Sequence, residues 1–198
     1  LSQWWTDLDA TPGARKNAYE TLRALLNTAA ADDRTLLIAS PLRIKGAARE
    51  ARVISKFLYT PTQVATLADE MPAPYRALVV LLADAGLRIN EALALTRSSI
   101  LEREDGGMSV RVEASLHRVG RHLEAGPTKT AAGVRTVALM DSTATTMRAH
   151  LRDYVAPGQQ AILFPALNGS GYARDKALTR LLVAAQARAG IEIPEGQT

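Results

Sequence analysis

The sequence predicts a mixed α+β fold that is rich in helices, with one small antiparallel sheet inserted among them. Three observations support this prediction. Apolar residues recur at three- and four-residue spacing in several segments, as they do in amphipathic helices. Two shorter segments alternate apolar and polar residues, which is typical of strands. A basic stretch at residues 43–57 separates residues 1–42 from residues 58–198, so we expect a small helical domain, a linker and a larger domain.

The first helix is expected over residues 14–38. Its apolar face is formed by Ala18, Leu22, Leu25, Leu26 and Ala29. The pattern weakens at Asp32 and Asp33 and ends at Ser40-Pro41, because the residue before a proline is pushed out of the helical region. A second helix should start at Thr60-Pro61, with Thr60 as the cap and Pro61 at the first helical position.

A third, more uniformly apolar helix is expected over residues 75–85, and its composition predicts that it is buried. Gly86 should end this helix, because glycine readily adopts the left-handed conformation of a helix C-terminus. A short helix then runs through residues 91–95. Arg88 would therefore lie at the junction between two helices.

The strands are expected in the middle of the chain. Residues 108–116 alternate Val110 and Val112 with polar residues and follow an Asp-Gly-Gly turn, and residues 135–139 alternate in the same way. Helical periodicity returns at residues 140–154 and 174–189. These strands supply the small sheet between helices.

Composition restricts the classes of function. The chain has 47% hydrophobic and 22% charged residues, and no apolar run approaches the roughly 18 residues of a membrane span, so no membrane partner is expected. It has no cysteine and three dispersed histidines, which argues against disulfides and against a metal site. We therefore expect no metal, no cofactor and a cytoplasmic location. The isoelectric point of about 9.6 permits a nucleic-acid partner.

The basic stretch concentrates positive charge between two nearly neutral regions. Its cations are Arg43, Lys45, Arg49, Arg52 and Lys56, against the single acid Glu50. A linker of this composition is suited to lie along a polyanion, so these five residues are candidate DNA contacts. A solvated charged loop is the equally weighted alternative.

The string Gly86-Leu87-Arg88-Ile89-Asn90-Glu91 is the first candidate for chemistry. An arginine at an element junction can project its guanidinium from a rigid base, grip two phosphate oxygens at once and stay charged at any working pH. Glu91 would orient it. The alternative is an ordinary surface Arg-Glu pair on a helix.

The string Thr128-Lys129-Thr130, with Arg135 five residues later, is the second candidate. Lys129 should stand at the tip of a probable hairpin, just before a strand. A partly desolvated lysine near a phosphate can donate a proton to a leaving oxygen. The alternative is an exposed loop lysine without a function.

In this order the two strings resemble the tyrosine recombinase family, and specifically the integrases of phages and actinobacterial prophages. In that family Gly-Leu-Arg-x-x-Glu carries the first catalytic arginine and Thr-Lys-Thr-x-x-x-x-Arg carries the catalytic lysine. The resemblance implies that Arg88 and Lys129 are catalytic and that Glu91 supports them. It also implies that residues 1–42 end a helical core-binding domain and that residues 58–198 belong to a catalytic domain.

The resemblance further implies site-specific DNA recombination during phage integration and excision. A tyrosine would attack a DNA phosphodiester and form a 3′-phosphotyrosyl link, which needs neither cofactor nor metal. The implied partners are double-stranded DNA at attachment sites, a homo-tetramer on that DNA, and accessory DNA-bending or directionality factors, in the cytoplasm of a bacterial host. The family's second arginine and its tyrosine are expected after Thr198, so this chain should bind DNA without cleaving it.

Two alternatives stay open at this point. The chain could be a DNA-binding module without catalysis, or a helical interaction protein that uses its alanine-rich faces and never meets DNA. The three histidines, His117, His122 and His150, are interpreted as ordinary surface or linker residues, and none as part of a site.

Overall fold

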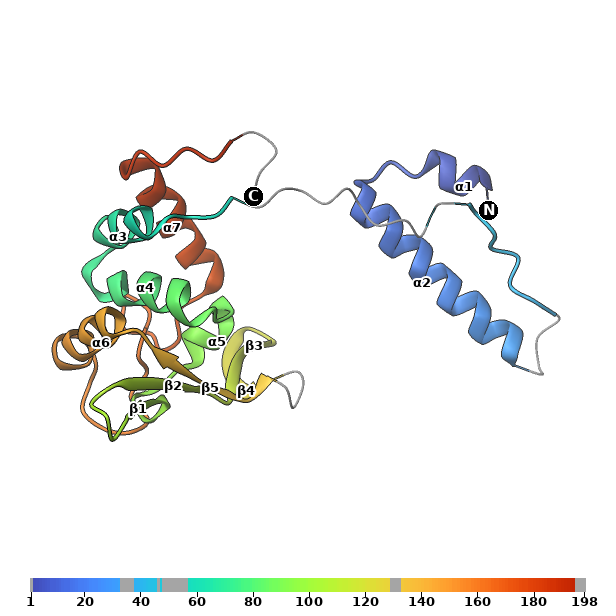
Figure 1. Ribbon diagram of the computed structural model, residues 1–198. Helices are drawn as coiled ribbons and strands as arrows, with labels where there is room; N and C mark the ends of the chain where they lie inside the picture. Colours follow the sequence, from blue (N-terminus) through green and yellow to red (C-terminus); the bar gives the residue numbers. More distant parts are fainter. Residues whose placement is uncertain (1, 33–37, 46, 48–56, 129–132, 195–198) are drawn as a thin grey trace. The chain divides into compact units, whose positions relative to one another are not determined.

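The computed structural model describes residues 2–32, 38–45, 47, 57–128 and 133–194 of the 198-residue chain. The chain forms two compact units: a small unit of Leu1–Phe57 with Glu195–Thr198, and a large unit of Leu58–Pro194 (Figure 1). The two units are distinct in packing, and each has its own buried residues.

The small unit contains α1 (Ser2–Asp7), α2 (Pro12–Ala31) and, after α2, the described residues 38–45 and 47. Thr11 caps α2 by accepting a hydrogen bond from the amide of Ala14, and Pro12 occupies the first turn. The predicted extension of this helix to residue 38 is wrong, because α2 ends at the extended residue Asp32 and Ile38 lies in a bend. The core of the unit is formed by Tyr19, Leu42 and Ala47 with Trp5, Leu22, Leu26 and Ile44.

The helices at the start of the large unit follow the predicted boundaries closely. α3 (Pro61–Asp69) begins with a capping box in which Thr60 and Gln63 satisfy each other's backbone amides. A short 3-10 turn (Ala73–Tyr75) leads into α4 (Arg76–Ala85), whose buried face includes Leu78 and Leu81. The short α5 (Ile89–Ala94) follows after three residues.

The strands form two antiparallel sheets, so the prediction of one sheet needs correction. β1 (Ile100–Glu102), β2 (Met108–Val112) and β5 (Arg135–Leu139) make one sheet in the order β1-β2-β5. β3 (Ala114–Val119) and β4 (His122–Pro127) make the other. The predicted strand over residues 108–116 is divided at Glu113, where the chain leaves the first sheet for the β3–β4 hairpin.

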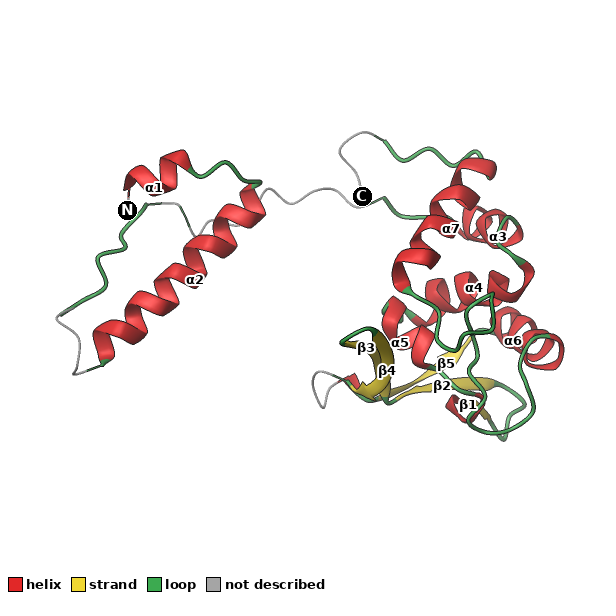
Figure 2. Ribbon diagram, turned by 180° about the vertical axis from the view of Figure 1, so that it is seen from behind, coloured by secondary structure: helices red, strands yellow, loops and turns green. Residues whose placement is uncertain are grey.

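Of the two remaining helices, α6 (Asp141–Asp153) packs on the first sheet and α7 (Asp175–Arg188) packs on α3. α6 contacts β2 and α4, and α4 also packs against β5 and α3 (Figure 2). Phe164, from the loop between α6 and α7, is fully buried, and the hydroxyl of Tyr75 donates to the carbonyl of Pro165 at 2.8 Å. The sheet and α5 are thereby fixed on one helical core.

His150 is buried, with 3% of its surface exposed, so its interpretation as a surface or linker residue is wrong. Its ring stacks on Phe164 and Tyr154, and Nε2 donates to the carbonyl of Leu163 at 2.8 Å. Burial lowers the pKa of this histidine, which therefore packs as a neutral aromatic ring. His117 and His122 are exposed on the β3–β4 hairpin.

Candidate active site

The junction between α4 and α5 aims Arg88 by its backbone geometry. Gly86 ends α4 in the left-handed conformation, with φ of 58° and ψ of 34°, as predicted. Leu87 is then buried, and Arg88 is the extended residue that caps α5. A side chain at position 86 would be strained in this conformation. The turn therefore anchors the chain at Leu87 and leaves the Arg88 side chain 80% exposed.

Glu91 is the buried acid that holds this arginine. Its carboxylate accepts hydrogen bonds from the Arg88 backbone amide at 3.0 Å and from Arg88 Nη1 at 2.9 Å. Its second strong partner is Arg135, the first residue of β5, whose Nη2 lies 2.7 Å from Glu91 Oε2. Only 3% of the Glu91 side chain is exposed, against 30% for Arg135. One carboxylate thus connects a helix start to the edge of the sheet.

Glu91 stays charged despite its burial. Burial by itself raises the pKa of this carboxyl, but the hydrogen bonds from Arg135 and from Arg88 outweigh it and hold the pKa at about 2. Charged hydrogen bonds of this kind are the stronger class in proteins. The acid therefore keeps its grip on both arginines at any pH near neutrality.

Arg135 is not among the residues predicted as a site, although it ends the second string. The sequence contained one signal for Arg135, since the string that carries Lys129 includes an arginine at this position. What the sequence could not give is its partner, which lies 44 residues earlier in the chain. Arg135 Nη1 also donates to the carbonyl of Gly133 at 3.1 Å.

The other predicted residues are distributed unequally. Lys129 lies outside the described residues, and so do Arg49, Arg52 and Lys56. Arg43 and Lys45 are exposed in the small unit. Among all the predicted site residues that the structure describes, Arg88 and Glu91 are thus brought into contact, while Arg43 and Lys45 belong to another unit.

The residues on either side of segment 129–132 lie very close together. A Cβ atom added to Gly133 would stand 2.6 Å from Cβ of Thr128 and 2.7 Å from its hydroxyl oxygen. No side chain can be accommodated at 133 without moving Thr128. Glycine is therefore required where the chain enters β5, next to the carbonyl that Arg135 binds.

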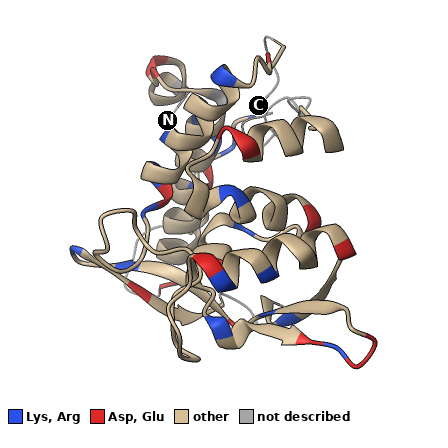
Figure 3. Ribbon diagram, turned by 90° about the vertical axis from the view of Figure 1, so that its left-hand side faces the viewer, with Lys and Arg blue, Asp and Glu red and all other residues tan. Residues whose placement is uncertain are grey.

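Basic residues also gather at the tip of the β3–β4 hairpin and the start of α7. They line a small hollow of about 90 Å³ together with one acid, and comprise Arg118, Arg121, His122, Arg174 and Lys176 with Asp175. Acids and bases occur together elsewhere in the unit, for example on the turn between β1 and β2 (Figure 3). The hairpin tip is thus a cationic surface that sequence alone did not reveal, because its two groups, 118–122 and 174–176, are more than 50 residues apart.

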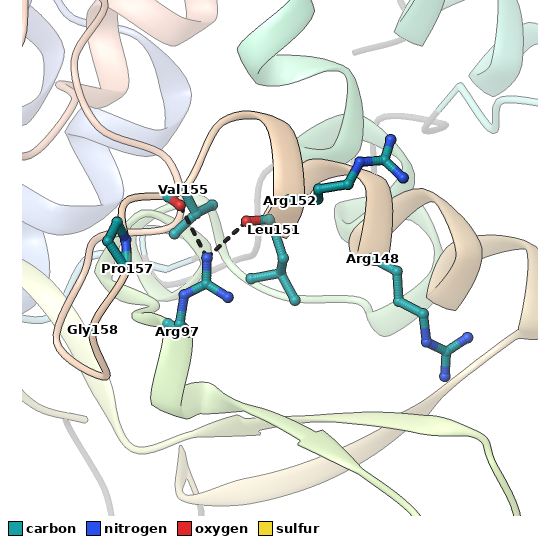
Figure 4. Close-up of a pocket in the computed structure, with 7 residues that line it drawn as sticks. All are labelled: Arg97, Arg148, Leu151, Arg152, Val155, Pro157 and Gly158. Carbon is teal, nitrogen blue, oxygen red and sulfur yellow. Dashed lines mark hydrogen bonds between the residues drawn. The ribbon is translucent and has the colours of Figure 1, made fainter.

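A larger hollow of about 550 Å³ lies at the end of α6 and is lined by three arginines, Arg97, Arg148 and Arg152 (Figure 4). Their guanidinium groups are engaged elsewhere. Arg97 donates to the carbonyls of Leu151 and Val155 at 2.7 and 2.9 Å, which caps the end of α6. Arg148 pairs with Glu102, and Arg152 pairs with Asp153. This hollow is better explained by stability of the fold than by ligand binding.

The described part of the chain supports neither a metal site nor a membrane-spanning helix. Within it, no three His, Asp or Glu side chains gather as they would around a metal ion. Its helices are also each too short or too polar to cross a bilayer.

Comparison with known proteins identifies relatives among integrases. No family model matches the chain. It is 33% identical over 192 residues to the prophage phiRv2 integrase of Mycobacterium tuberculosis, covering 96% of this chain and 50% of that protein. It is 33% identical over 191 residues to the integrase of Mycobacterium phage FRAT1, covering 94% and 55%. The chain thus spans about half the length of the curated relatives it matches.

Solved structures show the same fold. The Tn1549 transposon integrase, in complex with transposon right end DNA, superposes with a TM-score of 0.76 at 16% identity, covering 99% of this chain and 66% of that one. The arrangement of helices around small antiparallel sheets is therefore shared. The Gly-Leu-Arg-x-x-Glu and Thr-Lys-Thr strings, the integrase relatives and this fold agree, so the chain is similar to phage integrases of the tyrosine recombinase family.

Proposed function

We propose that the complete protein carries out site-specific DNA recombination, integrating and excising phage DNA by strand cleavage and rejoining. The observation that carries this proposal is the Arg88 guanidinium, exposed on a fixed helix junction and held on one side by buried Glu91. A single Nη1 bond to Glu91 leaves further donors of the fork available for phosphate oxygens. This arrangement supports the proposal that Arg88 binds a scissile phosphodiester.

The chemistry follows that of the family. A tyrosine hydroxyl attacks the phosphorus, the bond to the 5′-oxygen breaks, and a 3′-phosphotyrosyl link forms. Arg88 stabilises the negative charge on the non-bridging oxygens as the transition state develops. Lys129 gives a proton to the leaving 5′-oxygen. A 5′-hydroxyl of the partner strand then attacks the phosphotyrosyl link, which restores the DNA and frees the tyrosine.

We place the nucleophile outside these 198 residues. The hydroxyl of Tyr75 is buried against Pro165, and that of Tyr59 bonds to Gln186. Tyr19 is buried in the core of the small unit. Tyr154 and Tyr172 precede α7, ahead of the region in which the family carries its tyrosine. The 198-residue chain alone should therefore bind DNA without forming a covalent adduct.

DNA contacts are proposed in two places. The basic stretch with Arg43, Lys45, Arg49, Arg52 and Lys56 would follow the phosphate backbone, and the cationic hairpin tip would add contacts from the large unit. Recombination joins two sites with two protomers each, so the working form would be a homo-tetramer on DNA, with accessory bending or directionality factors, in the cytoplasm of the bacterial host.

The proposal is tested with a nicked suicide substrate that carries an attachment site and traps the cleaved state. The complete protein should accumulate a phosphotyrosyl adduct, and the 198-residue chain should shift the DNA in a gel without forming one. If the complete protein bound the site but formed no adduct, the chain would be a DNA-binding module without catalysis. Adduct formation by the 198-residue chain would place the nucleophile among its five tyrosines.

A further inference from the structure

We propose that Arg135 is a positioning residue of the recombinase site, which acts through Glu91 to keep Arg88 available for the phosphate. This inference rests on the proposed function and adds to it a residue that does not itself touch DNA. It starts from a conflict at the site. A carboxylate that orients an arginine also competes with the phosphate for the same guanidinium.

Charge balance shows how Arg135 resolves the conflict. Arg88 and Glu91 alone would form a pair without net charge, whereas the three side chains together keep one net positive charge. Only 3% of the Glu91 side chain is exposed, so water screens the charge of this carboxylate poorly. The second guanidinium therefore restores the positive potential that a phosphodiester needs.

Geometry gives Arg135 a second effect. Its Nη2 and the Arg88 backbone amide both bind Glu91 Oε2, at 2.7 and 3.0 Å, which leaves Oε1 to the Arg88 guanidinium. The carboxylate is thus fixed in one rotation, with one oxygen assigned to each task. Arg135 is itself anchored by the carbonyl of Gly133 and by its place in β5, paired with Val112.

Other titratable side chains on the elements packed against α5 have partners of their own. These are His117 with the carbonyl of Pro127, Arg118 with the carbonyl of Gly120, Asp84 with the amide of Met140, and Arg76 with the carbonyl of Asp69. Within the described residues, Glu91 therefore takes its charged hydrogen bonds from Arg88 and Arg135.

The test uses the complete protein and the suicide substrate, with the variants Arg135→Gln, Arg135→Lys and the double variant Arg135→Gln/Glu91→Gln. Arg135→Gln should slow adduct formation by roughly ten- to a hundredfold, the range found when a group that orients a functional ligand is lost. Arg135→Lys, which keeps the charge, should recover part of this loss. The double variant should form the adduct faster than Arg135→Gln, because Glu91→Gln removes the negative charge that the loss of Arg135 leaves uncompensated.

A pH series separates positioning from simple stabilisation. Without Arg135, the buried carboxyl loses the partner that lowers its pKa, so a fall in pH from 7.5 to 5.5 should protonate Glu91, remove the uncompensated negative charge and narrow the difference in rate between Arg135→Gln and wild type. The matched control is Arg111→Gln, an arginine of the neighbouring strand that is half exposed and paired with Glu113. It should leave rate and pH profile unchanged.

The outcomes are distinguishable. A wild-type protein that forms no adduct contradicts the proposed function, not this inference. The inference is overturned if Arg135→Gln keeps the wild-type rate, or if its loss is independent of pH and is deepened by Glu91→Gln. A readout free of catalysis is a carboxyl NMR titration of Glu91 in the 198-residue chain, in which Arg135→Gln should raise the pKa of Glu91. An unchanged pKa would also overturn it.

Discussion

Two groups of arginines in the same unit differ in what their guanidinium groups are left to do. Around Glu91, two arginines share one buried acid, and Arg88 keeps 80% of its side chain exposed. Around the hollow at the end of α6, each arginine has its own carbonyls or acid. An arginine cluster is thus a candidate binding site only where the donors outnumber the acceptors that the fold provides.

The physical cause of the difference is the depth of the acid. Glu91 is buried and fixed by two elements, so it can hold two cations in one geometry. Glu102 and Asp153 lie at the surface, where a pair with an arginine adds little to stability and imposes little geometry. Arginine therefore leaves donors free of the fold in one place, whereas in the other its donors go to carbonyls and acids of the fold itself.

The largest expected effect is a loss of cleavage rate without a loss of stability, at the arginines around Glu91. In the complete protein, Arg88→Ala should lower the rate of adduct formation by roughly 10²- to 10³-fold or more, because a charged donor to the transition state is lost. The free energy of unfolding should change by less than about 0.5 kcal/mol, since the side chain is mostly exposed. Rate is measured on the suicide substrate and stability by urea unfolding. DNA affinity should fall only modestly, and a large loss of stability would contradict this assignment.

At the arginines around the end of α6 we expect the opposite result, a loss of stability without a loss of cleavage rate. Arg97→Ala should destabilise the large unit by about 2 kcal/mol, because the carbonyls at the end of α6 lose a charged donor. Adduct formation by the folded complete protein should stay within threefold of wild type at 20 °C. The measurement is urea unfolding of the 198-residue chain, with Arg152→Ala as the control, since its exposed pair with Asp153 contributes little. Equal losses in both variants would argue against the capping role.

The third prediction uses the pH dependence of stability to separate α6, which carries His150, from the site around Glu91. His150 on α6 has a pKa lowered by burial from an ordinary value of 6.5, so the unfolded chain binds its proton first. The contribution of His150 is complete above about pH 6.5 and is lost as the pH falls below it. Glu91 has a folded pKa of about 2 against 4.5, so its contribution is complete above about pH 4.5 and is lost only as the pH falls toward 2.

Unfolding free energies measured from pH 7.5 to pH 5 should therefore decline in wild type partly through His150. His150→Phe, which keeps a ring against Phe164, should reduce this slope, and Glu91→Gln should leave it unchanged in the same range. Identical slopes in wild type and His150→Phe would show that other groups cause the decline.

The smallest effect concerns cations outside both groups. Replacing Arg43, Lys45, Arg49 and Arg52 with alanine should weaken DNA binding for all sequences alike and flatten the dependence of log Kd on log salt, by up to about 0.9 per charge removed. Fluorescence anisotropy at several salt concentrations measures this slope. A slope equal to that of wild type would remove the basic stretch from the DNA interface.

Local patterns in the sequence predicted most of the helical framework and two of the three residues joined at the candidate site, Arg88 and Glu91. Thr60-Pro61, Gly86 and the string through Glu91 determine their structure over a few residues, and each was confirmed. Arg135 was not predicted as a site residue, because its contact with Glu91 depends on how β5 approaches α5. The burial of His150 was not predicted, because nothing in the sequence around this polar ring indicates that it stacks on Phe164.

The second sheet was missed for a related reason. β4 contains His122, Gly126 and Pro127 and lacks the alternation of apolar residues that marks a strand. It forms because its partner β3 is already extended beside it, joined by a turn at Gly120 with φ of 61°. Pairing between strands, and not the propensity of β4 itself, determines its structure.

The 44 residues between Glu91 and Arg135 also set an order of events during translation. At a ribosome speed of about 5 to 20 residues per second, Glu91 is made roughly 2 to 9 seconds before Arg135. Throughout that interval the helix α5 lacks the strand that completes its ion network. The ion network around Glu91 is therefore a late product of synthesis, because the nascent chain completes it only once β5 has emerged and joined the sheet.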